Sequence, residues 1–279
     1  MRVILLVGSR NHTLASIFLK SLNAIGETID EVILCDGVLP LSQRIFSYLN
    51  LNKIVSHIQG KVVTWLRKVY LKNNPSLQTY QGLFDRWSPR GENSWDLFTE
   101  FTYDVIQYVM DQKIPVRHFS SINGVPLKSY LKGLGKAAVI CYGGGILKKE
   151  LFKELPEIIF VNSHMAKVPP FRGMNVAEWS VMSGEGLEVT VMAMNSGIDT
   201  GPILYRMPYE ANEARTTADL RKAGYLATCK AMSEIVPMLR QEQFTPLAQE
   251  KEQGKPHYCM HTELKDQVAR KLMKGINAH

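Results

Sequence analysis

Cysteine is scarce in this sequence, and no two cysteines form a C-x-x-C pair; the four are Cys35, Cys141, Cys229 and Cys259. This spacing argues against zinc ribbons, iron–sulfur clusters and a disulfide scaffold, so we expect reduced thiols and no metal site. Long apolar runs are also missing, since the best one, Val3–Val7, is far shorter than the ~18 residues of a membrane span. We therefore expect a cytoplasmic protein with no transmembrane segment and no signal peptide.

Acidic residues are absent from one long stretch, between Leu51 and Phe84. Five basic residues lie there: Lys53, Lys61, Arg67, Lys68 and Lys72. They contribute to a net charge of +7, which permits binding to nucleic acid, an anionic membrane or a phosphorylated metabolite. A solvated basic helix face is the simpler interpretation.

The hydrophobic pattern at the N-terminus alternates between strand and helix. Arg2–Gly8 is a buried-strand run, Thr13–Ile25 has apolar residues at helical spacing, and Glu31–Asp36 is a second strand. A strand–helix–strand opening predicts an α/β fold with a Rossmann-like, doubly wound and mostly parallel sheet that has helices on both faces.

The same alternation resumes in the second half of the chain. We expect strands or extended chain at Pro115–His118, Ala137–Tyr142, Ile158–Asn162, Val189–Met194 and Gly201–Pro208. We expect helices at Trp95–Met110, Lys128–Leu134, Leu147–Leu155, Ala177–Met182, Thr216–Leu239 and Leu264–Met273. Thr216 or Thr217 is expected to cap the long helix, with Asp219 in its first turn.

Residues 39–94 interrupt this pattern. Within them, Lys53–Leu71 repeats apolar residues at intervals of three and four, which predicts an amphipathic helix in an insertion on the sheet. The alternatives are a subunit interface, as in a homodimer, or a surface that touches an anionic acceptor or a membrane. We predict one domain over residues 1–242 with this helical insertion. Residues 243–279 would be a short extension, too small for a second full domain.

Three polar segments follow predicted strands. They are Tyr142-Gly143-Gly144-Gly145-Ile146-Leu147, then Asn162-Ser163-His164 with Pro169-Pro170-Phe171-Arg172-Gly173, and finally Gly197-Ile198-Asp199-Thr200-Gly201-Pro202. Because ligands of open parallel sheets bind beyond the carboxyl ends of the strands, we expect these loops to converge on one crevice.

The side chains in these segments suit one kind of reaction. Asn162 and His164 are two apart on extended chain, so they point to the same face. Histidine exchanges protons near neutral pH, and an asparagine amide can stabilise an oxyanion. A carboxylate such as Asp199 can orient the imidazole. Singly, each signal is weak, because a lone histidine or an I-D-T-G turn is more often structural. Together they suggest direct attack of a substrate nucleophile on an acyl carbon.

Combined, the segments resemble the 10-formyltetrahydrofolate-dependent formyltransferases, which include glycinamide ribonucleotide, methionyl-tRNA and sugar N-formyltransferases. The family pattern Asn-x-His-Pro-Ser-Leu-Leu-Pro-x-Tyr-Arg-Gly aligns without a gap over Asn162–Gly173, and a later Asp-x-Gly aligns with Asp199–Gly201. The resemblance covers Ala137–Leu204 well. It extends only weakly to the N-terminal strands and to the tail around Gln249 and Tyr258.

The resemblance implies a role for each matched position. Asn162, His164 and Asp199 match the catalytic trio of the family. The co-substrate 10-formyltetrahydrofolate would lie between two loops, one formed by Tyr142, Gly143, Gly144, Gly145, Ile146 and Leu147, the other including Asn195, Gly197 and Ile198. In the implied mechanism an amine attacks the formyl carbon, and Asn162 and protonated His164 stabilise the oxyanion that forms. His164 then relays a proton to the leaving folate nitrogen. Asp199 holds His164 and an ordered water.

Departures from the family pattern concern the acceptor side. Met165-Ala166-Lys167 stands where the family has Pro-Ser-Leu, and Phe171 replaces a tyrosine. Lys167 can pair with an acceptor phosphate or carboxylate, or it is a solvated loop lysine. Ser9 and Arg10 stand where the glycinamide enzymes place a glycine-rich phosphate loop, and the missing glycines argue against that purine substrate. Acceptor contacts are therefore predicted at Ser9, Arg10, Lys167, Phe171 and Arg172.

The acceptor expected from this resemblance is a small-molecule amine, with an amino sugar or nucleotide-linked amino sugar preferred. An amino-acid or hydroxylamine acceptor, or a methionyl-tRNA formyltransferase-like activity, is the alternative. Nucleic acid is disfavoured because no aromatic and basic stripe is evident. A non-catalytic folate-binding or interaction module is the alternative of another class.

Overall fold

The computed structural model describes residues 1–8, 11–35, 97–98, 105–143, 145–250 and 254–275. The predicted insertion at residues 39–94, with its amphipathic helix, lies outside these residues, as do Ser9, Arg10 and Gly144. The described ranges all belong to one unit of the chain, Met1–Gly37 together with Gly91–His279.

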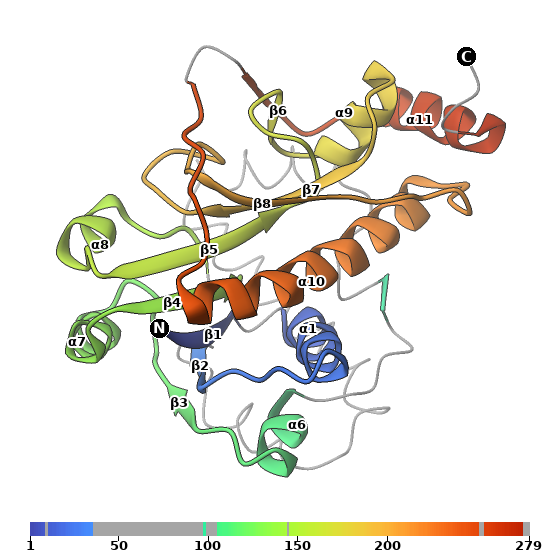
Figure 1. The fold of residues 1–279 in the computed structure, drawn as a ribbon. Helices are drawn as coiled ribbons and strands as arrows, with labels where there is room; N and C mark the ends of the chain where they lie inside the picture. Colours follow the sequence, from blue (N-terminus) through green and yellow to red (C-terminus); the bar gives the residue numbers. More distant parts are fainter. Residues whose placement is uncertain (9–10, 36–96, 99–104, 144, 251–253, 276–279) are drawn as a thin grey trace, which may run out of the picture. The chain divides into compact units, whose positions relative to one another are not determined.

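A sheet of seven strands organises the described residues, in the order β3-β2-β1-β4-β5-β7-β8 (Figure 1). Its members are β1 (Arg2–Gly8), β2 (Glu31–Cys35), β3 (Val116–His118), β4 (Ala137–Tyr142), β5 (Ile158–His164), β7 (Glu188–Ala193) and β8 (Ile203–Pro208). Strands β1 to β5 are parallel to one another, and β7 pairs antiparallel with both β5 and β8. The predicted α/β fold with a mostly parallel sheet is confirmed.

Helices cover both faces of this sheet, because the central strands are apolar on both sides. The helices are α1 (His12–Ala24), α6 (Val105–Asp111), α7 (Val125–Leu134), α8 (Lys149–Glu154), α9 (Val176–Ser183), α10 (Thr217–Gln241) and α11 (Thr262–Lys274). Helices α1 and α10 lie on one face of the sheet, and α7 and α8 lie on the other (Figure 1). Val3, Leu5 and Val7 of β1 share a core cluster with residues of α1 and α10, whereas Ile4 and Leu6 share another with residues of α7 and α8. This double burial is typical of parallel sheets.

The order of the strands reverses between β1 and β4, since the chain runs from β1 to β2 and β3 on one side and then returns to β4 on the other. Loops that follow strands on either side of such a switch point form the usual ligand site of an open α/β sheet. Here the two loops meet: a Cβ on Gly143, after β4, would lie 1.9 Å from the Asn11 amide nitrogen, after β1.

The direction of β7 corrects one step of the sequence argument. Three loops were expected at three carboxyl ends of parallel strands, but β7 runs against β5, with Ala193 paired to Val161 in the body of β5. The turn after β7 therefore leaves the sheet beside the middle of β5. Asp199 reaches His164 because this turn folds back, and not because the two strands end together.

Most predicted elements agree with the structure to within a few residues. The long helix begins with a capping box, in which the Thr216 side chain accepts from the Asp219 N–H and Asp219 accepts from the Thr216 N–H, as the sequence predicted. Burial favours protonated Asp219, but hydrogen bonds from Thr216 and Arg215 outweigh it and lower the pKa of the carboxyl below its usual 3.8. Two three-residue strands, β6 (Phe171–Gly173) and β9 (Lys255–His257), were not predicted.

No helix among the described residues is both long enough and apolar enough to cross a membrane. The longest, α10, carries acidic and basic side chains along its length and contains Pro237.

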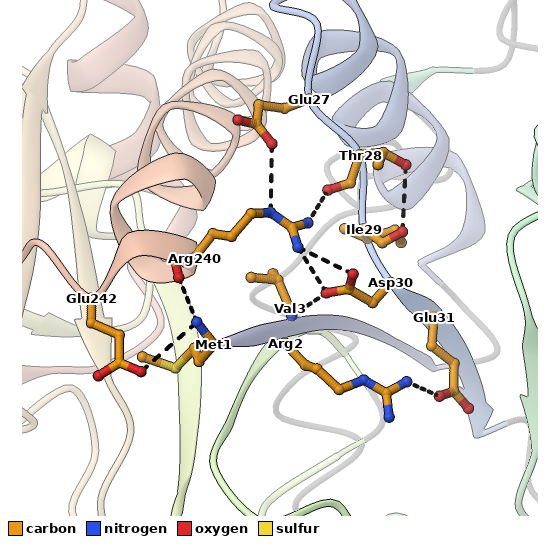
Figure 2. A network of polar contacts seen from close by, with 10 residues as sticks. All are labelled: Met1, Arg2, Val3, Glu27, Thr28, Ile29, Asp30, Glu31, Arg240 and Glu242. Atoms are coloured by element: carbon orange, nitrogen blue, oxygen red, sulfur yellow. Dashed lines mark hydrogen bonds and ion pairs between the residues drawn. The ribbon is translucent and has the colours of Figure 1, made fainter.

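A network of charged groups joins the end of α10 to the beginnings of β1 and β2 (Figure 2). Arg240 Nη1 lies 3.1 Å from both carboxylate oxygens of Asp30, and its Nη2 donates to the Thr28 carbonyl at 2.7 Å. Asp30 also accepts from the Val3 N–H at 2.7 Å. These contacts lie at the amino ends of β1 and β2, so they fix the helix on the sheet at the edge away from the loops that follow β1 and β4.

We predict that Arg240→Met lowers the free energy of unfolding by about 1–2 kcal/mol, because a charge-assisted bridge is lost while the partner carboxylate stays partly buried. Both side chains are 31% exposed, so solvent screening keeps the loss moderate. Urea unfolding measures the change. Lys230→Met is the control, since Lys230 is 68% exposed and its ammonium lies 3.9 Å from Glu234, which is a long ion pair. This substitution should cost less than about 0.5 kcal/mol. Equal effects of the two variants would contradict the assignment.

Candidate functional site

Strand β5 presents the first two members of the predicted trio. It continues two residues beyond its predicted end, so Asn162 and His164 both lie on the strand and share one face. His164 is buried, opposite Thr190 of β7. The Thr190 hydroxyl donates to the Ala166 carbonyl at 2.8 Å, which fixes the chain just after the histidine. The Asn162 amide makes no side-chain hydrogen bond within the described residues.

The contacts of His164 define which nitrogen is free to exchange a proton. Its Nε2 lies 2.7 Å from the carbonyl oxygen of Phe171, which can only accept, so Nε2 carries a hydrogen. Its Nδ1 lies 3.6 Å from Asp199 Oδ2, too far for a direct hydrogen bond but close enough for the carboxylate to stabilise an imidazolium. The hydrogen bond to Phe171 thus assigns the tautomer of the neutral ring, with the hydrogen on Nε2 and the lone pair on Nδ1.

Asp199 is held by backbone contacts on both sides. Its Oδ2 accepts from the Gly173 N–H at 2.9 Å. Its own backbone has φ +51°, in the left-handed region that Asp adopts more readily than most residues. The turn closes tightly, because a Cβ on Gly201 would lie 1.7 Å from the Ala193 carbonyl oxygen. The predicted meeting of an imidazole and a carboxylate is thus present in the structure.

Segment Phe171–Gly173 connects the two groups, and two of its side chains were predicted to contact the acceptor. The Phe171 ring is buried among Ala166 and Val176. Arg172 is also buried, and its guanidinium donates to Gln249 Oε1 and to the Glu250 carbonyl. These positions favour packing and bracing roles for both side chains over direct contact with an acceptor.

The loop after β4 keeps its backbone open to solvent. Gly143 and Gly145 are exposed with positive φ, Ile146 is 88% exposed, and Leu147 is buried. Tyr142 ends the strand with a buried ring, and burial raises the pKa of its hydroxyl well above the usual value. Its side chain therefore belongs to the core, which leaves only its backbone to face a ligand.

The turn after β7 forms the other predicted wall. Asn195 Oδ1 accepts from the Gly197 N–H and from the Thr200 hydroxyl, each at 2.9 Å, so the turn holds its own shape. Ile198 is 73% exposed at its tip. Two strongly exposed isoleucines, Ile146 and Ile198, thus stand on the two loops that the sequence assigned to one ligand.

The remaining acceptor-side prediction concerns Lys167. It follows His164 by three residues and is partly exposed, and its side chain forms no ion pair or hydrogen bond inside the part of the chain that the structure describes. Ser9 and Arg10 lie outside that part, so their predicted contact with an acceptor stays a prediction.

Sequence reasoning missed two amides that shape these loops. Asn123 donates to the Ile146 carbonyl at 2.9 Å and accepts from the Lys148 N–H at 2.8 Å, so it holds the loop after β4 from both ends. Gln249 braces the turn that carries Asp199. Each amide lies more than twenty residues along the chain from the groups that it binds, so local patterns could not reveal it. The only signal in the sequence was the weak family resemblance around Gln249.

A metal centre has no basis in the described ranges, where no group of three or more His, Cys, Asp or Glu side chains is arranged to hold an ion.

Known proteins resemble this chain in sequence and in fold. Residues 128–236 match the family model described as formyl transferase. The methionyl-tRNA formyltransferase of Thermodesulfovibrio yellowstonii is 31% identical over 114 residues, which are 40% of this chain and 36% of that protein. The matched part thus spans little more than a third of that relative's length.

Two solved structures share the fold over nearly the whole chain. A sugar N-formyltransferase from Shewanella sp. has a TM-score of 0.51 at 14% identity and covers 98% of this chain and 87% of its own. The N-formyltransferase from Helicobacter canadensis, solved with folinic acid and dTDP-3-aminofucose, has a TM-score of 0.50 at 16% identity and covers 92% of this chain and 71% of its own.

The fold and the site define a Rossmann-like α/β protein with a histidine–carboxylate pair beside the end of its β5 strand. The family match contains every member of that pair and the loops around it. Residues 128–236 thus resemble the formyl transferase family, in agreement with the resemblance noted from the sequence.

We predict that Gly201→Ala lowers the free energy of unfolding by about 2–3 kcal/mol, since the new methyl would overlap the backbone of Ala193 and force the Asp199 turn to move. Gly133→Ala is the matched control: it lies in α7 with nothing within 4 Å of the added carbon, so it should stabilise by about 0.5–1 kcal/mol. Urea unfolding separates the two. An unchanged midpoint for Gly201→Ala would contradict the tight turn.

Proposed function

We propose that this protein is an N-formyltransferase that moves a formyl group from 10-formyltetrahydrofolate to the amine of a small acceptor. The observation that carries the proposal is the His164–Asp199 pair, 3.6 Å apart and on the same side of the site as Asn162, within residues that match the formyl transferase model. Folinic acid bound to the Helicobacter canadensis protein supports a folate co-substrate.

The two loops fit a planar folate ring for a physical reason. Ile146 and Ile198 each expose a large apolar side chain, one on each predicted wall, that a flat ring could cover. Gly143 and Gly145 add no side chain beside the backbone polar groups that would read the ring edge. Asn123 and Asn195 hold the two loops in place before a ligand arrives, which reduces the entropy lost on binding.

The proposed reaction follows from the positions and the chemistry of the three side chains. The acceptor amine attacks the formyl carbon, a carbon–nitrogen bond forms, and the carbonyl oxygen becomes an oxyanion that the Asn162 amide stabilises. His164 Nδ1 takes the proton that the amine loses, and Asp199 stabilises the imidazolium. The imidazolium then gives the proton to the folate nitrogen as its bond to the formyl carbon breaks. The products are a formamide and tetrahydrofolate, and no covalent intermediate is needed.

A nucleotide-linked amino sugar is the acceptor that we favour. The Helicobacter canadensis structure contains such an amine, and Lys167 places a cation without an ion-pair partner in the described residues three positions after His164. The identity to methionyl-tRNA formyltransferases supports a second candidate, the amino group of methionyl-tRNA.

We predict that His164→Asn and Asp199→Asn each reduce turnover by about 10²-fold or more, because the first removes the proton carrier and the second removes the charge beside it. Binding of 5-formyltetrahydrofolate, measured by calorimetry, should change little. His118→Asn is the control, since His118 lies on the edge strand β3, away from β5, and should leave turnover within about twofold. Near-normal turnover in either site variant would remove its assigned role.

The acceptor is tested with a panel of dTDP- and UDP-linked amino sugars, free amino acids and methionyl-tRNA, each with 10-formyltetrahydrofolate. We expect release of tetrahydrofolate and a formylated product with an amino sugar, and a loss of acceptor affinity in Lys167→Ala. Formylation of methionyl-tRNA alone would establish the second candidate and overturn the first. Folate binding without transfer to any acceptor would indicate a binding module.

A further inference from the structure

One amide side chain, that of Gln249, joins the two segments that hold the His164–Asp199 pair. Its Oε1 accepts from Arg172 Nε at 3.1 Å and from Arg172 Nη2 at 2.9 Å. Its Nε2 donates to the carbonyls of Asp199 at 3.1 Å and Gly201 at 2.6 Å. The amide thus accepts two hydrogen bonds and donates two, which is its full capacity. Its orientation is unambiguous, because a flipped amide would place its NH2 group against the guanidinium of Arg172 and its oxygen against two carbonyl oxygens.

The segments that Gln249 joins are the ones that orient the reacting groups. On one side, Arg172 stands between Phe171, whose carbonyl accepts from His164, and Gly173, whose N–H donates to Asp199. On the other side, Asp199 and Gly201 are the ends of the turn that carries the carboxylate. The amide therefore braces the segments that hold the imidazole and the carboxylate without contacting His164 Nδ1 or the Asp199 carboxylate oxygens.

We propose that Gln249 is a positioning residue for formyl transfer, one that sets the distance between His164 Nδ1 and the Asp199 carboxylate. This inference rests on the proposed function and extends it to the segment after α10, beyond the residues that match the family model. The turn needs such a brace, because the Asp199 backbone has φ +51°, in the left-handed region. The Gln249 amide also donates to the carbonyls of Asp199 and Gly201.

Glutamine is the side chain that these contacts demand. A glutamate keeps an acceptor for Arg172 but sets a negative oxygen against two carbonyls, so it releases the Asp199 turn while preserving the other half of the brace. A methionine of similar length removes both halves and leaves the buried guanidinium without this acceptor. The pair of variants therefore separates the contact with the turn from the contact with Arg172.

The test compares Gln249→Glu and Gln249→Met with the parent protein. We expect kcat to fall by roughly 10- to 100-fold, since small displacements of reacting groups carry losses of this size. The KM for 10-formyltetrahydrofolate should stay within about threefold, because Gln249 contacts the turn after β7 only at Asp199 and Gly201, whereas the Asn195 side chain holds the part assigned to the folate ring. Hydrogen exchange of the Gly173 amide, followed by NMR, should become at least tenfold faster, because its acceptor on Asp199 is no longer held in place.

Gln243→Met is the matched control, as Gln243 is an exposed glutamine of the same tail. It should change neither kcat nor the Gly173 exchange rate. If Gln249→Met does not fold, Gln249→Glu carries the test. The inference is overturned if both folded variants keep kcat within about twofold of the parent, or if they lose activity while Gly173 exchange stays at the parent rate.

Failure of the proposed function gives a different result. In that case the parent protein transfers no formyl group to any acceptor, and His164→Asn changes nothing. The hydrogen-exchange measurement does not require activity, so it still decides whether Gln249 holds the Asp199 turn. Unchanged exchange of the Gly173 amide in Gln249→Glu would show that it does not.

Discussion

The site depends on two backbone hydrogen bonds from one three-residue segment. The Phe171 carbonyl accepts from His164, and the Gly173 N–H donates to Asp199, so a single short strand sets both the tautomer of the imidazole and the position of the carboxylate. Backbone groups are suited to this task, because they have no rotamers to lose and keep their direction as long as the strand stays in register. The pairing of β6 with β9 keeps that register.

That register is itself maintained by close backbone approaches that exclude side chains. A Cβ on Gly173 would lie 2.3 Å from the His257 carbonyl oxygen, and a Cβ on Gly254 would lie 1.7 Å from the Pro169 carbonyl oxygen. The Met174 N–H donates to the same His257 carbonyl at 2.9 Å. The chain after α10 is thus part of the site's construction, although the family model ends at residue 236. Its contribution is geometric, whereas the groups to which we assign the chemistry lie on β5 and on the turn after β7.

How far the sequence could predict this arrangement depends on the range of each interaction. The strands β1 and β4 and the capping box at Thr216 follow from local patterns, and the spacing of Asn162 and His164 follows from the two-residue period of a strand. The direction of β7 could not be derived, because periodicity carries no information about strand polarity. The contact between Arg172 and Gln249 could not be derived either. The motif identifies the arginine, but its partner lies 77 positions away along the chain.

The two predicted walls of the ligand site show how a loop can be rigid and still exposed. Packing would have fixed them by covering their side chains, but a covered Ile146 or Ile198 could not contact a ligand. Instead, amide side chains bind the loop backbones: Asn123 from a neighbouring turn and Asn195 from within its own. In the proposed function the folate ring covers these apolar surfaces, and because the loops are held in place before binding, the binding energy is available for orientation of the formyl group.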